Sequence, residues 1–334
     1  MIIMLNHSRY GRFVIFFILL IITCSILLIG NYPLLANIIF VIIIGALLVN
    51  LFIEYLIIQI FRKIYFQKPS IEVEPWVELI ADCRGVEARA MLNRRDESAP
   101  LLLMIHGWKS SAESVRERAE WFCDQGWHAL IVEMPGHGKA MTVEKWTAIR
   151  VIEHTVELMS ALDSLLPPQD ITEIVYYGHS MGGFVGLNLS KRIDDYPWGN
   201  KIKGWILESP MTKYSLVYED SIKRNRIPKI LHSSIQKRLF AQLSALHPQE
   251  NTIHSLMQLD VPLWGLPQQP TLILQAEEDS VLGRSHYDLL VSSMVDAGRE
   301  GILTTHLIED LPHSGARTNS TRNYHIEQWL EKSF

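Results

Sequence analysis

One stretch of the chain decides the fold, and it reads Ile174-Val175-Tyr176-Tyr177-Gly178-His179-Ser180-Met181-Gly182-Gly183. Its first half is apolar and β-prone, and residues 184–189 can continue it as a helix. In this order of strand, tight turn and helix the pattern G-x-S-x-G has a meaning, because the turn lifts the serine hydroxyl above the sheet. Gly178 and Gly182 flank the serine where a Cβ would crowd the turn, and Gly183 lets the helix approach closely. Ser180 is therefore a candidate nucleophile.

The pattern by itself is a weak signal. With glycine at about 7% of residues, G-x-S-x-G occurs by chance in about one chain in ten of this length. A nucleophilic serine also needs a base, and the base needs an acid that orients it. Asp279 comes just after a predicted strand, and His313 lies in a loop just after another. Because the carboxyl ends of parallel strands meet at one edge of a sheet, we expect Ser180, Asp279 and His313 to converge.

The rest of the chain from Pro69 onward alternates predicted strands with predicted helices. Strands are expected as a pair within 76–93 and at 101–105, 127–133, 202–208, 271–275 and 302–308, in addition to the strand before Ser180. Helices are expected at 112–125, 144–166, 284–297 and 321–331, in addition to the helix after Ser180. This alternation is typical of an α/β fold with a mostly parallel sheet. Residues 211–269 break it, and we predict that they form a helical lid over the carboxyl ends of the strands.

On these motifs, the chain from Trp76 to the C-terminus resembles the α/β-hydrolase superfamily, and most nearly the branch of monoacylglycerol lipases, lysophospholipases and serine aminopeptidases. The resemblance is carried by His106-Gly107-Trp108, Pro135-Gly136-His137-Gly138, Gly178 to Gly183, Asp279 and Pro312-His313. The order Ser180, Asp279, His313 is also the order of the triad in that superfamily. The resemblance implies a mostly parallel central sheet with helices on both faces.

The resemblance also assigns roles to individual residues. It makes Gly178, His179, Gly182 and Gly183 the nucleophile elbow around Ser180, with His313 as base and Asp279 as acid. It implies that the backbone N–H groups of Met181 and Trp108 form the oxyanion hole. Losing one such donor typically costs on the order of 10²–10³ in rate.

Other residues compete for these roles. Glu208 follows another predicted strand, at a position that some relatives use for the acid, whereas Asp310 is too near His313 in sequence to reach its ring easily. Structural roles are predicted for three histidines in turns, and surface positions for three in the lid. The first three are His106, His137 and His179, and the lid histidines are His232, His247 and His254. Glu133 stands where the family usually has aspartate, and we expect it to fix the loop that follows.

Two apolar runs near the N-terminus, 13–30 and 34–53, are each about as long as a membrane span. A signal peptide is the alternative for the first run, but its length and the second run argue against it. Basic residues lie before the first run and after the second, at Arg9, Arg12, Arg62, Lys63 and Lys68. The positive-inside rule then places both ends in the cytoplasm. We predict a two-span anchor within residues 1–68, a turn at 31–33, and a cytoplasmic hydrolase domain at 69–334. Residues 54–66 either continue the second span or lie along the interface.

The composition of the chain limits the classes of partner and cofactor that it could bind. The net charge of -5 gives no support for nucleic-acid binding. The three cysteines, Cys24, Cys83 and Cys123, suggest no disulfide framework, and no His and carboxylate spacing indicates a metal site, so no metal or other cofactor is expected. The expected partners are the lipid bilayer and a small-molecule or lipid ester.

The sequence favours serine hydrolysis of a carboxylic ester through an acyl-enzyme. The anchor and the lid favour a lipid-like ester, because the lid mixes basic and apolar residues that suit anionic headgroups, although an ordinary solvated helix face would look the same. The lid residues in question are Lys223, Arg224, Arg226, Lys229, Lys237 and Arg238 among Ile222, Ile227, Ile230, Leu231 and Leu239. Two alternatives stay open, namely a serine aminopeptidase-type peptide hydrolase, with Glu219 and Asp220 as a thin basis for binding an amino terminus, and a membrane-anchored binding module on the same fold.

Overall fold

The computed structural model describes residues 9–30, 33–248 and 252–334. Most of the predicted turn at 31–33 lies outside these residues. The chain forms two compact units, one made of residues 1–62 with 222–254 and the other of 63–221 with 255–334. The domains predicted from the sequence, 1–68 and 69–334, differ from these units in two places. The prediction puts the whole lid in the hydrolase domain, and it puts residues 63–68 in the anchor.

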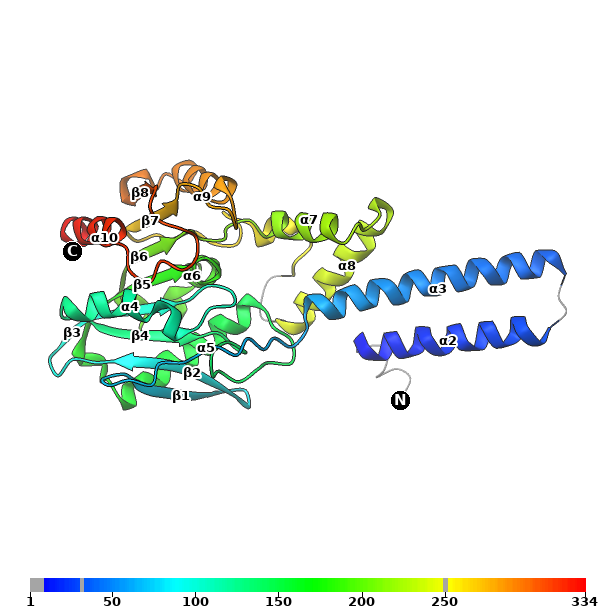
Figure 1. The fold of residues 1–334 in the computed structure, drawn as a ribbon, viewed down its shortest axis with the longest axis horizontal. Helices are drawn as coiled ribbons and strands as arrows, with labels where there is room; N and C mark the ends of the chain where they lie inside the picture. The colour runs from blue at the N-terminus through cyan, green and yellow to red at the C-terminus, as the bar shows by residue number, and fades with distance from the viewer. Residues whose placement is uncertain (1–8, 31–32, 249–251) are drawn as a thin grey trace. The chain divides into compact units, whose positions relative to one another are not determined.

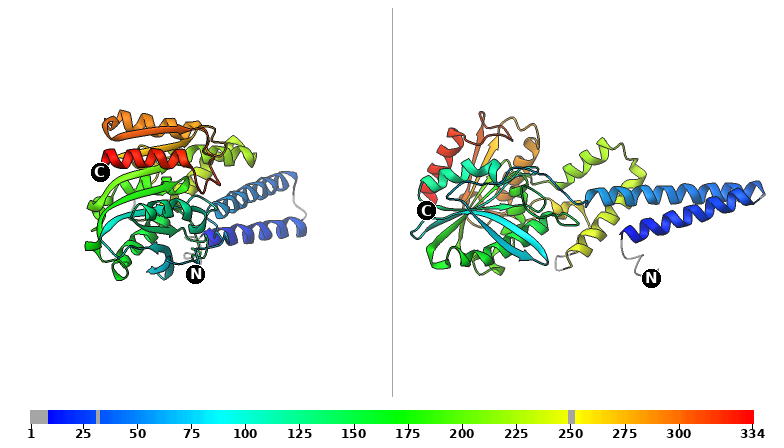
Figure 2. Two further views of the ribbon diagram at one scale, coloured as in Figure 1. Left: turned by 60° about the vertical axis from the view of Figure 1, so that its left-hand side comes forward. Right: turned by 60° about the horizontal axis from the view of Figure 1, so that its bottom comes forward.

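The larger unit is built around an eight-stranded sheet with the order β1-β2-β4-β3-β5-β6-β7-β8 (Figure 1). The strands are β1 (Val77–Cys83), β2 (Val86–Asn93), β3 (Ala99–Ile105), β4 (His128–Glu133), β5 (Ile171–His179), β6 (Ile202–Glu208), β7 (Thr271–Ala276) and β8 (Leu303–Ile308). β2 pairs antiparallel with β1 and with β4, and every other pairing is parallel. The mostly parallel α/β fold predicted from the sequence is therefore confirmed, and Figure 2 shows the twist of this sheet.

Helices cover both faces of the sheet because successive strand residues point to opposite sides. On one face, Phe122 of α4 (Ala112–Asp124) and Trp329 of α10 (Ser320–Ser333) join Tyr177 of β5 in one buried apolar cluster. On the other face Tyr176 packs against Gly186 of α6 (Met181–Ser190), where an added Cβ would lie 2.3 Å from the tyrosine ring. Two further helices of this unit are α5 (Ala148–Ala161) and α9 (Arg284–Asp296). The central strands are thus buried from both sides, as their continuous apolar runs predict.

Element boundaries follow local chemistry. The predicted helix at 144–166 begins only at Ala148, because the Thr147 side chain accepts a hydrogen bond from the N–H of Arg150 at 3.2 Å and caps the helix. The predicted lid is helical in pieces, as expected, with α7 (Tyr214–Arg224), α8 (Lys229–Leu246) and a short 3₁₀ turn at Leu256–Leu259.

The smaller unit contains α2 (Arg9–Ile29), α3 (Leu34–Ile60) and the lid helix α8. In Figure 1, α2 and α3 form a helical hairpin. By length and composition α3 could cross a membrane, since 27 residues span about 40 Å. The apolar helical stretch Val14–Leu28 is shorter. A two-span anchor therefore stays a prediction.

Helix α8 packs against the C-terminal half of α3 within this unit. Arg238 of α8 forms an ion pair with Glu54 at 3.1 Å and donates to the side-chain oxygen of Asn50 at 2.5 Å. Glu54 is only 1% exposed, and its neighbour Ile57 is fully buried. A charged residue in an otherwise apolar helix is costly unless it is paired. The pairing with Arg238 therefore explains how α3 tolerates a carboxylate at this position.

Candidate active site

Ser180 sits in a strained turn between β5 and α6. Its backbone has φ 51° and ψ -108°, a left-handed region that non-glycine residues rarely adopt. The turn leaves no room at its flanks, because a Cβ on Gly178 would lie 2.6 Å from the carbonyl of Gly182. A Cβ on Gly182 would lie 2.0 Å from the carbonyl oxygen of Ile105. The spacing G-x-S-x-G is thus required by close backbone packing at both glycines.

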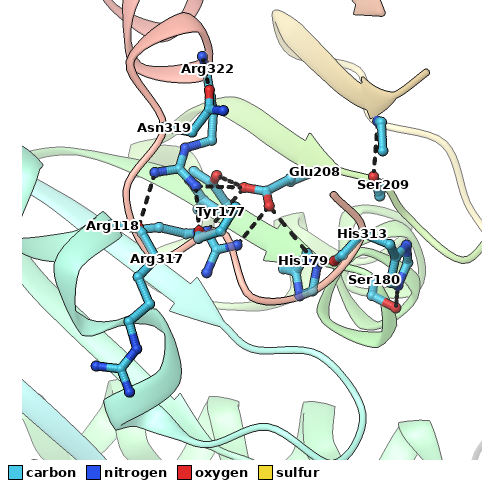
Figure 3. Close-up of polar contacts among 12 residues, drawn as sticks. Arg118, Tyr177, His179, Ser180, Glu208, Ser209, His313, Arg317, Asn319 and Arg322 are labelled. Carbon is cyan, nitrogen blue, oxygen red and sulfur yellow. Dashed lines mark hydrogen bonds and ion pairs between the residues drawn. The ribbon is translucent and has the colours of Figure 1, made fainter. Parts of the chain in front are cut away.

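The structure brings Ser180, His313 and Asp279 into one hydrogen-bonded line. His313 Nε2 lies 3.1 Å from Ser180 Oγ (Figure 3), and His313 Nδ1 lies 2.7 Å from Asp279 Oδ2. A nitrogen that faces a carboxylate carries the proton, so Nδ1 is the donor and Nε2 is left as the acceptor for the serine proton. All three residues are less than 10% exposed. This arrangement can deprotonate the serine hydroxyl during attack on a carbonyl.

The Asp279 carboxylate is held by several donors. Its Oδ1 accepts the backbone N–H groups of Val281 and Leu282 at 2.9 and 2.8 Å, and its Oδ2 also accepts from the Gln275 side chain at 3.0 Å. Burial favours the neutral acid, but the hydrogen bond with His313 and the two backbone donors outweigh it and hold the Asp279 pKa below its usual range. The carboxylate therefore stays charged and can stabilise a protonated His313.

The two residues predicted to supply the oxyanion hole lie on either side of the serine. Met181 is the first residue of α6, so its N–H belongs to a helix N-terminus that favours negative charge. Gly107 packs directly on the elbow, since a Cβ there would lie 3.4 Å from Ser180 Cβ, and Trp108 is the next residue. Oxyanion binding by Met181 and Trp108 stays a prediction.

Comparison with known families agrees with this geometry. A family model described as serine aminopeptidase, S33, matches residues 96–261, which include Trp108 and the elbow and end before Asp279. The match, the sheet order and the strand–elbow–helix turn all point to the same fold. The chain has the α/β-hydrolase fold.

Solved structures of esterases share the fold. The Pyrococcus furiosus esterase Pf2001 superposes with a TM-score of 0.57 at 13% identity, covering 81% of this chain and 99% of the esterase. The ferulic acid complex of Est1E from Butyrivibrio proteoclasticus gives 0.52 at 16% identity, covering 76% and 98%. In sequence, the chain is 27% identical over 111 residues to epoxide hydrolase A of Mycobacterium tuberculosis. That alignment spans a third of each chain, 33% in both cases.

The two rival acids, Glu208 and Asp310, have other partners. Glu208 is 1% exposed and faces Arg118, with Nη2 to Oε1 at 2.9 Å and Nε to Oε2 at 3.2 Å (Figure 3). Asp310 accepts from the side chains of Asn319 and Thr321 at the start of α10. Asp279 is the acid that the structure places against the His313 ring.

A buried polar network supports the loop that carries His313, and sequence reasoning did not find it. Besides Arg118, Glu208 is contacted by the Tyr177 hydroxyl and by Arg322 Nη1 at 3.6 Å. Burial alone would raise the pKa of the Glu208 carboxyl. The charges of Arg118 and Arg322 outweigh burial and hold this pKa below its usual range, so the carboxyl stays ionised.

Arg322 and His179 connect this network to the loop that carries His313. Arg322 donates to the backbone carbonyls of Ala316 and Arg317 at 3.1 and 3.2 Å. The His179 ring donates through Nε2 to the carbonyl of His313 at 2.7 Å. Burial lowers the pKa of His179 to about 4, so it stays a neutral donor at physiological pH.

The other histidines divide as follows. His106 accepts the Met134 N–H at 3.2 Å, and His137 contacts the Pro135 carbonyl through Nδ1 at 3.1 Å, so both fix loops as predicted. In the lid, His254 is exposed and His232 half-buried, but the predicted surface position of His247 is wrong because this residue, at the C-terminal end of α8, is fully buried.

Glu133 behaves as the sequence predicts. Its carboxylate accepts the backbone N–H groups of Ala112 and Lys139 at 3.3 and 3.1 Å. Because it is buried, its pKa is raised above the ordinary value. Within the described residues, no group of three His, Cys, Asp or Glu side chains could hold a metal ion, and all three cysteines are free thiols.

Proposed function

We propose that this α/β-hydrolase is a serine esterase that cleaves carboxylic esters through an acyl-enzyme. The observation that carries the proposal is the hydrogen-bonded line from Ser180 through His313 to Asp279. Ser180 Oγ attacks the acyl carbonyl while His313 Nε2 takes its proton, and Asp279 stabilises the resulting imidazolium. The N–H groups of Met181 and Trp108 hold the oxyanion.

The second half of the reaction uses the same groups in reverse. His313 gives its proton to the leaving alkoxide, which departs as an alcohol. Water then enters, His313 takes one of its protons, and the hydroxide attacks the acyl carbonyl of the ester formed with Ser180. Collapse of this second tetrahedral intermediate releases a carboxylic acid and returns the proton to Ser180.

The substrate we propose is a lipid-like ester presented by a membrane. Support comes from the apolar helix α3 and from the basic stretch around the start of α8. Its basic side chains are exposed at Lys223, Arg224, Arg226 and Lys229, beside Ile230, which is 86% exposed. Such a surface suits anionic headgroups. We also propose that residues 1–68 form a two-span anchor with both ends in the cytoplasm, which protease accessibility of intact and opened membranes would test.

The match to a serine aminopeptidase model keeps peptide hydrolysis as the second candidate. Such an enzyme would bind a free amino terminus through acidic residues. A binding module without catalysis is the third candidate, since fold alone does not establish function.

Fluorophosphonate labelling separates these candidates at the first step. We expect the purified full-length protein to be labelled at Ser180, and Ser180→Ala to lose both labelling and esterase activity. Folded wild type that resists the probe would favour the binding module. Rates on monoacylglycerol in vesicles, on a soluble p-nitrophenyl ester and on an aminoacyl p-nitroanilide then define the class. No preference for the vesicle substrate would count against the lipid proposal.

A further inference from the structure

The segment between α3 and β1 reaches into the active-site wall. Two residues separate the end of α3 from residues 63–68, and the structure groups residues 63–68 with the larger unit. Phe66 forms a parallel β-bridge with His137, and its N–H donates to the carbonyl of Gly136 at 2.7 Å. These contacts attach the segment to the loop Pro135-Gly136-His137-Gly138, one of the motifs that the proposed chemistry does not use.

Close packing at Gly136 shows that this attachment is specific. Gly136 has φ +75°, and a Cβ there would lie 2.1 Å from the carbonyl oxygen of Ile64 and 3.6 Å from its side chain. Ile64 itself is buried. A glycine is therefore needed at position 136 both for its backbone conformation and for the approach of the segment.

The Phe66 ring also contacts Trp108, in the loop His106-Gly107-Trp108 that is predicted to supply an oxyanion donor. Its centroid lies 5.5 Å from the Trp108 ring at 77°, and 5.1 Å from the His137 ring. Trp108 is also contacted edge-on by His137 at 5.2 Å and by Trp146 at 4.5 Å. Edge-to-face aromatic pairs at these separations attract beyond the burial of their apolar area. The Trp108 indole, still 36% exposed, is thus held by three rings, one of which comes from the segment after α3.

We propose that Phe66 is a positioning residue for the loop that carries Trp108, so that the segment after α3, at the end of the predicted anchor region 1–68, completes the active site. The inference rests on the proposed role of the Trp108 N–H. An oxyanion donor must stand about 2.7–3.1 Å from the developing charge, and the indole is the part of Trp108 by which the surrounding structure can fix its backbone. Removing the Phe66 ring frees one side of the indole and loosens that N–H.

The test compares Phe66→Ala with Tyr65→Ala in the full-length protein in detergent. We expect Phe66→Ala to lower kcat on a soluble p-nitrophenyl ester about 10-fold, less than the 10²–10³ that complete loss of an oxyanion donor costs, because the N–H is loosened and not removed. KM should change little, and affinity for a boronic acid that mimics the tetrahedral intermediate should fall in parallel with kcat. Phe66→Trp should retain most of the activity. Tyr65 is 66% exposed, so Tyr65→Ala should leave kcat unchanged.

A second pair of variants perturbs the same contact from the other side. Gly136→Ala pushes a methyl group toward the Ile64 carbonyl, whereas Gly85→Ala adds the same strain at φ +80° with nothing within 4 Å. We expect Gly136→Ala to lose kcat and boronate affinity together, and Gly85→Ala to keep both. If Phe66→Ala does not fold, Phe66→Leu takes its place, with an expected loss of a few-fold.

Three results would overturn the proposal. Unchanged kcat in folded Phe66→Ala or Phe66→Leu would do so, and so would a lower kcat with unchanged boronate affinity, since that pattern reports a merely structural role. Equal losses in Gly136→Ala and Gly85→Ala would likewise remove the contact as the cause. Failure of the proposed function is separate, because it would appear as activity that survives in Ser180→Ala.

Discussion

Replacing Glu208 with glutamine tests which of two carboxylates, Glu208 or Asp279, is the acid of the triad. The Glu208 carboxylate is buried with Arg118 and Arg322, whose side chains are 4% and 1% exposed. A glutamine cannot neutralise these two arginines, so the substitution leaves buried positive charge without compensation. Breaking a buried pair in this way costs about 3–5 kcal/mol. For a unit of this size we expect Tm to fall by about 10 °C.

The expected loss of kcat is much smaller for Glu208→Gln than for Asp279→Asn. Glu208 contacts the backbone side of the His313 loop only through other residues, so Glu208→Gln should lower kcat less than about 10-fold at a temperature well below its Tm. Asp279→Asn removes the charge that faces Nδ1 and leaves the wrong tautomer, which costs on the order of 10⁴ in kcat. Glu277→Gln, at an exposed position two residues from Asp279, serves as the control and should change neither quantity.

Thermal unfolding followed by near-UV circular dichroism and initial rates on a soluble ester measure both quantities in one preparation. A Glu208→Gln protein with unchanged Tm and a kcat as low as that of Asp279→Asn would refute this reasoning. Glu208 would then matter to the His313 base as much as Asp279 does.

Three further expectations concern stability. Burial lowers the pKa of His106 to about 3 and of His179 to about 4, so the unfolded chain binds more protons below pH 6.5. Each of the two histidines should then lower the free energy of unfolding by about 1 kcal/mol as the pH falls from 7.5 to 5.5. A Tm that stays constant over this pH range would contradict the expectation. Glu54→Gln should expose the α8 backbone to faster hydrogen exchange, because Arg238 loses its ionic partner on α3, and unchanged protection of α8 would argue against that docking. Ser180→Gly should unfold at a higher temperature than Ser180→Ala, since glycine relieves the φ of 51° at a gain of about 1 kcal/mol, and equal Tm values would show that the elbow is unstrained.

The parts of the site that sequence reasoning found are those written in local patterns. The elbow is a contiguous motif after an apolar strand, and Asp279 and His313 follow strand ends that hydrophobic runs mark clearly. Parallel topology then brings those ends to one edge without any knowledge of side-chain contacts. Most strand and helix boundaries also agree with the prediction to within a few residues, whereas the helix predicted at 144–166 is shorter at both ends, Ala148–Ala161.

The supporting contacts could not be predicted, because they join distant and individually unremarkable residues. Arg118 lies in a helix rich in alternating charges, where a solvated position is the natural expectation, yet it faces Glu208 across 90 positions of sequence. Arg238 reaches Asn50 across 188 positions. In both cases a buried cation is acceptable only because a specific acceptor arrives from elsewhere in the fold. The exposure of His247 was mispredicted on the same ground, since one polar residue carries no signal of what packs around it.

The loop that carries His313 and the loop that carries Trp108 are therefore fixed by different kinds of contact, with different expected consequences for the proposed catalysis. The His313 loop is held by donors to its backbone carbonyls, from His179 and Arg322, which also ties it to the ionised Glu208. Charge-assisted contacts of this sort fail together when one member is removed. Trp108 is instead held by aromatic packing, so the loss of one ring weakens the contact while the other rings remain. Changes in the buried network should thus appear first as loss of folded protein, whereas changes in the segment after α3 should appear as graded loss of kcat in a protein that remains folded.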